Sequence, residues 1–338
     1  MIVDIVSLLF ILVFIVASSE LFTNGIEWLG QRLQLSEGVV GSVLAAVGTA
    51  LPETLIPIVA LIFFHGEHGA EVGVGAIAGA PFMLSTLTLG ICGVSSLIFT
   101  STGRREPGLE LKKGVIKRDL RFFMGAYALA LAGSYLPSQG FYRPLLAVIL
   151  VLFYPYYLYK SFRHEGEVGE QPETLYLDRL FNVGSDRLRV IMPQTVLGLA
   201  GITGGAYLFV RTIQNLADAI HFHPLLLSLI VSPIATELPE KINSVLWLRA
   251  KKDTMALGNV TGALVFQSCF PVAFGVAFTA WQLDVATMIT GLVALASASL
   301  YLALLTFGRL KPLHLTFGVL AYFVTITTII VLDLKNVI

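Results

Sequence analysis

One short motif occurs twice in this chain, as Gly48-Thr49-Ala50-Leu51-Pro52-Glu53 and as Ala235-Thr236-Glu237-Leu238-Pro239-Glu240. Both copies place threonine, proline and glutamate in the same order within apolar runs of sequence. Inserting an acidic side chain at the centre of a membrane helix costs about 3 kcal/mol. Because both motif copies carry such an acid at the same position, the sequence predicts a site that is assembled from two halves of the chain.

The composition around these motifs is that of a membrane protein. Of the 338 residues, 56% are hydrophobic and 13% are charged, and the mean hydropathy is +0.81. A soluble domain carries about 25% charged residues. Apolar runs of roughly 20 residues recur along the whole length, a pattern typical of membrane-spanning helices. We therefore expect an all-α integral membrane protein, and the net charge of zero does not favour a nucleic-acid partner.

Ten apolar segments are long enough to be transmembrane helices. Their predicted bounds are 3–30, 37–64, 70–100, 116–136, 141–162, 191–219, 224–249, 254–281, 284–307 and 312–333. A hydrophilic stretch, 164–190, is the predicted cytoplasmic linker between five spans in 1–163 and five spans in 191–338. Five is an odd number, so the second set enters the membrane from the opposite side. The sequence thus predicts two inverted five-helix repeats, which secondary transporters use with the ion site at the midplane between them.

The distribution of lysine and arginine predicts the orientation of these spans. Basic residues concentrate in the loops that follow spans 1, 3, 5, 7 and 9, above all in the run 104–121. On the opposite side, the spans are flanked only by Arg143 and Lys335. By the positive-inside rule, the protein is a multi-pass protein of the cell (plasma) membrane, with cytoplasmic odd loops and both termini extracellular.

Spans 3 and 8 share a second repeated feature. Gly75 and Gly79 in span 3 correspond to Gly258 and Gly262 in span 8, and both pairs are GxxxG motifs. Such pairs let two helix backbones approach closely. We expect both pairs to lie at helix–helix contacts.

The two opening motifs carry groups that bind hard cations. Within a helix, Thr49 and Glu53 are four residues apart and share a face. Pro52 and Pro239 have no N–H, so the carbonyl four residues before each of them lacks its helical donor. Hydroxyl, carboxylate and carbonyl oxygens suit Na⁺ or Ca²⁺. The candidate metal-binding groups are the side chains of Thr49, Glu53, Thr236 and Glu240 and the carbonyls of Gly48 and Ala235. The alternative is a pair of proline kinks whose glutamates hydrogen-bond to neighbouring helices.

The second copy adds two charged side chains. Glu237 and Lys241 are four residues apart, in the sign order that favours an intrahelical ion pair. Two interpretations of Lys241 remain open: it is a built-in cation that tunes the charge of the site, or it neutralises Glu237 or extends toward the cytoplasmic end of its helix. The formal charge at the centre is −3 from Glu53, Glu237 and Glu240, and Lys241 brings it to −2. That charge suits one divalent cation or two monovalent ones.

Each motif, with the glycine-rich span after it, resembles an α-repeat of the sodium/calcium exchanger family, part of the cation/Ca²⁺ antiporter superfamily. The resemblance covers 37–95 and 224–280. It implies ten helices, both termini outside, a central site formed by spans 2, 3, 7 and 8, and alternating access by sliding of spans 1 and 6. The family's threonines and paired glutamates match, in chain order, Thr49, Glu53, Thr236 and Glu240.

Other positions depart from the pattern of this family. Its ligand serines in spans 3 and 8 are replaced here by Ala80 and Ala263. Its amide or acid is replaced by Leu84 in span 3 and by Gln267 in span 8. Ser85 and Ser268 lie one residue further on and replace the missing hydroxyls only if the helix turns differently. Glu237 and Gln267 are accordingly second-half ligands or tuning groups.

These features predict a secondary antiporter that exchanges Ca²⁺, or a similar cation, for Na⁺ or H⁺ by alternating access at a midplane site. One alternative is a proton-coupled or monovalent-cation exchanger on the same fold, which the missing ligands motivate. A distant alternative is an intramembrane enzyme, whose signatures, such as HExxH, are absent from the sequence. The expected partners are inorganic cations and the lipid bilayer, with no covalent cofactor and no obligatory protein partner.

Overall fold

The described part of the chain is all helical. A computed structural model describes residues 2–33, 51–64, 67–137, 140–162, 174–181 and 188–334. These residues form helices joined by turns and short irregular segments, and none of them lies in a β-strand. The predicted all-α class is confirmed.

The helices fall on either side of the predicted linker. Those before it are α1 (Ile2–Arg32), α4 (Leu51–Phe63), α5 (Glu67–Met83), α6 (Leu89–Ser101), α7 (Lys113–Ala132) and α8 (Tyr142–Phe162). A π-helical turn, η2 (Leu84–Thr88), joins α5 to α6, and the short α9 (Tyr176–Phe181) lies within the linker. After it come α10 (Leu188–Ile220), α11 (Pro224–Thr236), α12 (Leu238–Arg249), α13 (Asp253–Phe278), α14 (Val285–Thr306) and α15 (Pro312–Leu334).

Seven helices of the described part are long and apolar enough to cross a membrane, so the chain is a multi-pass membrane protein. They are Val3–Gly30, Gly69–Ser101, Tyr142–Ser161, Leu188–Ile220, Asp253–Phe278, Val285–Thr306 and Pro312–Asp333. Two shorter apolar helices, Leu51–Phe63 and Pro224–Ile234, lie within the predicted spans 37–64 and 224–249. α7 is not among the seven, because lysine, arginine and aspartate in its first turns lower its hydropathy.

A proline accounts for the division of the predicted span 224–249 into two helices. α11 ends at Thr236, Glu237 has φ −93° and ψ 9°, and α12 begins at Leu238. Pro239 is the second residue of α12, a position where a missing N–H costs little. The helix break therefore falls inside the second motif, where the sequence predicts a carbonyl without its helical donor within one continuous span.

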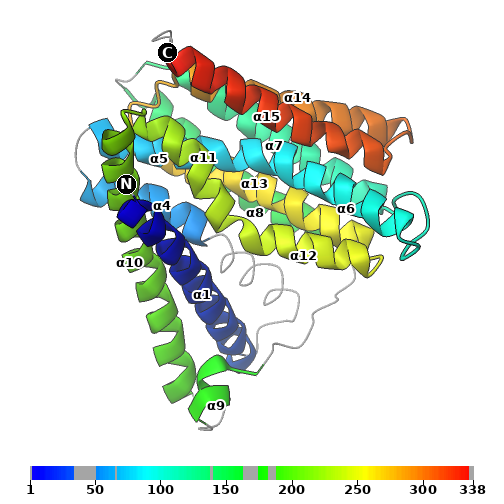
Figure 1. Cartoon of the computed structure of the whole chain (residues 1–338), viewed down its shortest axis with the longest axis horizontal. Coiled ribbons are helices and arrows are strands. Elements are labelled where there is room, and N and C mark those ends of the chain that lie inside the picture. The colour runs from blue at the N-terminus through cyan, green and yellow to red at the C-terminus, as the bar shows by residue number, and fades with distance from the viewer. Residues whose placement is uncertain are drawn as a thin grey trace.

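Two helices stand apart from the rest of the bundle. Figure 1 shows α1 and α10 side by side, running obliquely to the other helices. Glycines make their contact close: a Cβ at Gly198 would lie 2.6 Å from the backbone nitrogen of Phe22, and a Cβ at Gly201 would lie 2.3 Å from Ser18 Oγ. Because small residues let membrane helices pack backbone to backbone, α1 and α10 form one unit, which we call the α1–α10 pair.

The short helix α9 is anchored to one end of the α1–α10 pair (Figure 1). The Gln194 side-chain amide nitrogen of α10 donates to Asn24 Oδ1 of α1 at 2.8 Å, and the backbone nitrogen of Tyr176 donates to the same oxygen at 3.1 Å. Gln194 Oε1 accepts from the backbone nitrogen of Leu177 at 2.9 Å. The described part of the linker is therefore attached to this pair.

The remaining helices surround α5–α6 and α13, which are the most buried of the candidate spans. α5 contacts α4 and α11, and α13 contacts α12. η2 and α6 also contact α15, whereas α13 contacts α7 and α8. Each central helix thus lies against the last helices of the other half.

The two GxxxG pairs differ among the described contacts. A Cβ at Gly75 would lie 2.3 Å from the carbonyl oxygen of Leu225, and one at Gly79 would lie 2.2 Å from that of Leu229. The predicted close approach is therefore present between α5 and α11. At Gly262, by contrast, the nearest described atom is Tyr157 Oη, at an ordinary contact distance of 3.7 Å.

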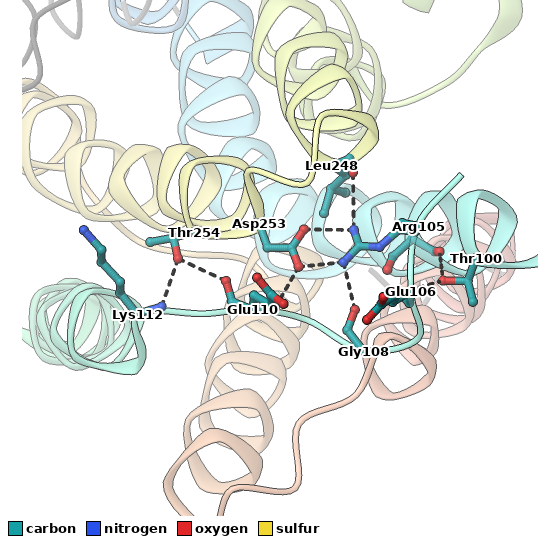
Figure 2. Close-up of polar contacts among 10 residues, drawn as sticks. Thr100, Arg105, Glu106, Gly108, Glu110, Lys112, Leu248, Asp253 and Thr254 are labelled. Carbon is teal, nitrogen blue, oxygen red and sulfur yellow. Dashed lines mark hydrogen bonds and ion pairs between the residues drawn. The ribbon is translucent and has the colours of Figure 1, made fainter. Parts of the chain in front are cut away.

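A polar latch joins the α6–α7 loop to the turn between α12 and α13 (Figure 2). Arg105 donates two hydrogen bonds to Asp253, from Nη1 to Oδ1 at 2.8 Å and from Nη2 to Oδ2 at 2.6 Å. Its Nη2 also donates to the carbonyl of Gly108 at 2.8 Å, and the backbone nitrogen of Glu110 donates to Asp253 Oδ2 at 2.8 Å. Both charged side chains are buried. This arginine of the basic run 104–121 is thus bound inside the protein.

Candidate functional site

The predicted ligands fall on neighbouring elements. Glu53 lies in the first turn of α4 and is 5% exposed. Thr236 and Glu237 lie at the α11–α12 break, where Glu237 is 1% exposed, and Gln267 is buried in α13. Because α4 contacts both α11 and α13, the elements that carry these side chains are adjacent.

The structure says less about four other predicted groups. Gly48 and Thr49 lie outside the described residues. The backbone of Ala235 lies in the last turn of α11, and that of Glu240 lies in the first turn of α12. Their roles as ligands therefore stay predictions.

Lys241 turns back from α12 toward the helix break. Its Nζ lies 3.3 Å from Glu237 Oε2 and donates to the carbonyl oxygen of Pro233 at 3.0 Å. It also lies 3.1 Å from Met83 Sδ, at the end of α5. Lys241 is only 9% exposed, so the predicted alternative in which it extends to the end of its helix is wrong. The predicted pairing with Glu237 is confirmed, and the ammonium group lies among α5, α11 and α12.

Thr236 is buried beside this cluster. Its Oγ1 donates to the carbonyl oxygen of Ser232 at 3.1 Å, one turn earlier in α11. A hydroxyl that donates to the backbone still has lone pairs for a cation. The hydrogen bond is thus compatible with the predicted role of Thr236 as an oxygen ligand.

The helix of span 3 departs from α-helical geometry, which is the condition for Ser85 to replace a missing hydroxyl. The π-helical turn η2 begins at Leu84, where the sequence lacks an expected ligand, and such turns are frequent at functional sites. Ser85 is fully buried, and its Oγ donates to the carbonyl of Phe82 at 3.2 Å. In α13, which is α-helical throughout, Ser268 is equally buried and donates to the carbonyl of Val265 at 2.9 Å. The two serine hydroxyls therefore bind their own helices at corresponding positions of the two halves.

An aromatic pair beside η2 was not predicted from the sequence. Phe82 stacks on Tyr322 of α15, with ring centroids 5.1 Å apart, and Tyr322 lies in the neighbourhood of Glu237. In the other half, Tyr154 of α8 packs edge-on against Phe266 of α13, with centroids 5.3 Å apart. A tyrosine in an apolar span belongs to no motif, so only the fold reveals that Tyr322 is near the break.

The buried acid Asp119 was also not predicted. Its Oδ2 accepts from Thr261 Oγ1 at 2.8 Å, and its Oδ1 accepts from Tyr157 Oη at 3.1 Å and from Arg118. These bonds tie α7 to α8 and α13. In the sequence Asp119 is hidden because it follows Arg118 within the basic run. Its oxygens are held by protein donors, so it acts as a helix anchor and we do not place it in the ion site.

The described side chains do not form a closed metal site by themselves. Within the described ranges, which leave out Thr49, no three His, Cys, Asp or Glu side chains are grouped to hold a metal ion. Buried side chains with oxygen atoms nevertheless lie on these adjacent elements, since Glu53, Thr236, Glu237 and Gln267 are all buried. Such a set can hold a dehydrated cation only with further oxygens from the backbone or from the two motifs.

Comparisons with known proteins give consistent results. A family model described as sodium/calcium exchanger protein matches residues 3–163 and 192–332. An uncharacterized membrane protein of Methanocaldococcus jannaschii is 24% identical over 252 residues, which cover 75% of this chain and 74% of that protein.

Two kinds of solved structure have a similar fold. The crystal structure of an H⁺/Ca²⁺ exchanger, CAX, is similar with a TM-score of 0.72 and 18% identity, over 98% of this chain and 87% of that chain. The sodium–calcium exchanger NCX_Mj, in a structure soaked with Na⁺ and Sr²⁺, is similar with a TM-score of 0.60 and 19% identity, over 97% and 98% of the two chains. At these identities the similarity shows a shared fold.

Proposed function

The chain belongs to the sodium/calcium exchanger family and is a transporter, not an enzyme; from this premise we propose that it exchanges Ca²⁺, or a similar cation, for Na⁺ or H⁺. The family predicted from the two motifs is confirmed, and the intramembrane enzyme is excluded with it. Exchange would occur by alternating access at a site near the midplane of the membrane.

The observation that carries this proposal is the burial of acids in both halves of a membrane protein. Glu53 on α4 and Glu237 at the α11–α12 break are both nearly inaccessible to solvent. Ionisable side chains at such depth are costly and mark ion pathways. In the proposed site, the carboxylates are those of Glu53 and Glu240. The surrounding ligands are Thr49, Thr236, Gln267 and the carbonyls of Gly48 and Ala235.

We propose further that residues 1–163 and 191–338 are inverted repeats of five helices each, joined by a linker at 164–190. The family model matches two separate stretches, 3–163 and 192–332, which supports this division. The contacts are also paired: α6 lies against α15 as α13 lies against α8, and Tyr322 meets Phe82 as Tyr154 meets Phe266.

The orientation of the chain is part of the same proposal. The turns after α6, α12 and α14 lie at one end of the molecule (Figure 1), and each follows a predicted span of odd number. Their basic residues favour the cytoplasm at this end of a plasma-membrane protein, with both termini outside.

Sliding of the α1–α10 pair would expose the site alternately to the two sides. The pair supports this role because its glycines hold the two helices together as a unit that lies oblique to the rest (Figure 1). α9 is bound to Asn24 and Gln194, so the linker would move with the pair.

A second candidate is a proton-coupled or monovalent-cation exchanger on the same fold. Ala80 and Ala263 have no side-chain oxygen, and the hydroxyls of Ser85 and Ser268 are bonded to their own helices. A site with fewer oxygen ligands favours the binding of protons or of a single small cation over the binding of several Na⁺ ions.

Uptake assays in proteoliposomes test both candidates. We expect Ca²⁺ to enter the liposomes only in exchange for Na⁺ or H⁺ that leaves down an outward-directed gradient. Liposomes without either gradient should take up no Ca²⁺. Uptake driven by a pH gradient alone, with Na⁺ absent, would assign H⁺ as the coupling ion. Exchange of monovalent cations without any Ca²⁺ movement would establish the second candidate in place of the first.

Replacing Glu240 with glutamine is expected to reduce uptake to the background of protein-free liposomes, because the site loses one of its two proposed carboxylates. Glu240 lies on α12; Asn259→Asp, which adds an acid on the neighbouring helix α13, provides a control for a change of charge in the same half of the protein. Size-exclusion chromatography of both variants checks that the fold is retained. Full activity of the Glu240→Gln variant would remove Glu240 from the site.

A further inference from the structure

We propose that Lys241 is a fixed internal cation: its ammonium group occupies a monovalent-cation position at the α11–α12 break, and exchange is electroneutral as a result. This inference rests on the proposed antiport function and adds a specific charge stoichiometry to it.

The surroundings of Lys241 Nζ are those of a bound cation. The Lys241 ammonium group donates to the Pro233 carbonyl at 3.0 Å and to Met83 Sδ at 3.1 Å, and it forms an ion pair with Glu237 Oε2 at 3.3 Å. A carboxylate and the carbonyl of a broken helix are the groups with which transporters coordinate Na⁺. Because Nζ already lies against both groups, a transported ion that used them would have to share them with a positive charge, which disfavours its binding there.

The position also favours a positive charge electrostatically. Pro233 belongs to the last turn of α11, whose carbonyls point toward the break. The C-terminal end of a helix carries a partial negative charge, which stabilises a cation placed there. The ammonium group therefore interacts with the helix end and with the Glu237 carboxylate together.

Close packing holds the ammonium group in place. One turn before Met83, a Cβ on Gly79 of α5 would lie 2.8 Å from Pro233 Cγ, so the α5 backbone lies against α11 at this level. Lys241 is 9% exposed between them. The ammonium group therefore lies in a tightly packed, nearly solvent-free place between these helices.

The stoichiometry follows from the charges that remain. Lys241 balances Glu237, which leaves −2 from Glu53 and Glu240 at the proposed site. One Ca²⁺ or two monovalent cations neutralise that charge equally well. Each transport cycle then moves the same charge in both directions, whichever coupling ion is used.

The test measures Ca²⁺ uptake by the intact protein in proteoliposomes whose membrane potential is clamped with K⁺ and valinomycin. With the wild-type protein we expect the same rate and the same final Ca²⁺ gradient at every clamped potential. A wild-type rate that changes with potential in the direction of three or more monovalent charges per Ca²⁺ would overturn the inference and leave the antiport function intact.

The variant Lys241→Met should free the cation position beside Glu237. One more monovalent cation then binds per cycle, and uptake becomes dependent on potential. At zero potential, a tenfold gradient of the coupling ion supports a Ca²⁺ gradient of about 100-fold with two ions and about 1000-fold with three, since each tenfold step is ~1.4 kcal/mol. An unchanged final gradient in an active Lys241→Met variant would contradict the inference.

A second variant separates charge from packing. Glu237→Gln combined with Lys241→Met removes both members of the pair, so the central charge stays at −2 and electroneutral exchange should return. Lys112→Met, at an exposed lysine of the α6–α7 loop, controls for loss of a positive charge. If Lys241→Met does not fold, the wild-type measurement and the double variant still decide. If the wild-type protein shows no gradient-driven exchange at all, the proposed function itself fails.

Discussion

Replacing Glu53 with glutamine is expected to abolish Ca²⁺ uptake while leaving the protein folded. Glutamine has nearly the same shape as glutamate, so the packing of α4 against α5, α10 and α13 should persist. The variant loses the negative charge that would hold the transported cation, and buried carboxylates in membrane helices are costly and often mark ion pathways. Uptake driven by opposing Na⁺ or H⁺ gradients should fall to that of protein-free liposomes.

The matched control is Glu106→Gln, the same substitution at an exposed glutamate of the α6–α7 loop. We expect this variant to retain wild-type uptake. Thermal unfolding in detergent should show similar midpoints for Glu53→Gln, Glu106→Gln and the wild-type protein. Full exchange by Glu53→Gln would remove the central claim of the proposed function.

Replacing Gly79 with leucine is expected to have the largest effect on stability. A Cβ at this position would lie 2.2 Å from the Leu229 carbonyl oxygen and 2.8 Å from Pro233 Cγ, so α5 and α11 must move apart to admit a side chain. Overpacking of this kind typically costs about 1–3 kcal/mol, and here the clash is with the backbone, which yields less than a side chain does. The midpoint of thermal unfolding in detergent should fall clearly.

The control for this prediction is Gly204→Leu, on the exposed face of α10. No described atom lies within 4 Å of a Cβ there, and both substitutions replace a helical glycine by leucine. The gain in helix propensity, about 0.8–1 kcal/mol, is thus the same in both variants. We expect the midpoint of Gly204→Leu to be unchanged or raised. Equal midpoints for the two variants would show that the α5–α11 contact is not rigid.

Much of this fold could be predicted because helices in membranes follow from apolar length. The predicted spans 141–162 and 312–333 differ from α8 and α15 by a single residue at one end of each. Proline chemistry drew attention to the second motif, where span 7 divides into two helices, because the effect of Pro239 on its own helix is local. The family could be predicted for the same reason, since its motifs are short and continuous in sequence.

Features that depend on contacts between distant residues could not be predicted. The sequence leaves open which way Lys241 turns along its helix, and the structure shows its Nζ also in contact with Met83, which lies on another helix. The π-helical turn at Leu84 has no reliable sequence signal. Asp119 is masked by its basic neighbours in the sequence, yet it is bound by side chains from α8 and α13. In each case tertiary packing supplies the information.

The latch between Arg105 and Asp253 bears on the route by which ions and water reach the site. Parting α6 from the α12–α13 turn would separate a buried, doubly hydrogen-bonded charge pair and break both of its hydrogen bonds. We therefore expect that seam to stay shut during the proposed transport. A hydrated pathway from this end would then form along the opposite flank, where the α1–α10 pair meets α4. If the α1–α10 pair slides as proposed, the ion would enter and leave beside that pair, and the latched flank would keep its place while the pair moves against α4.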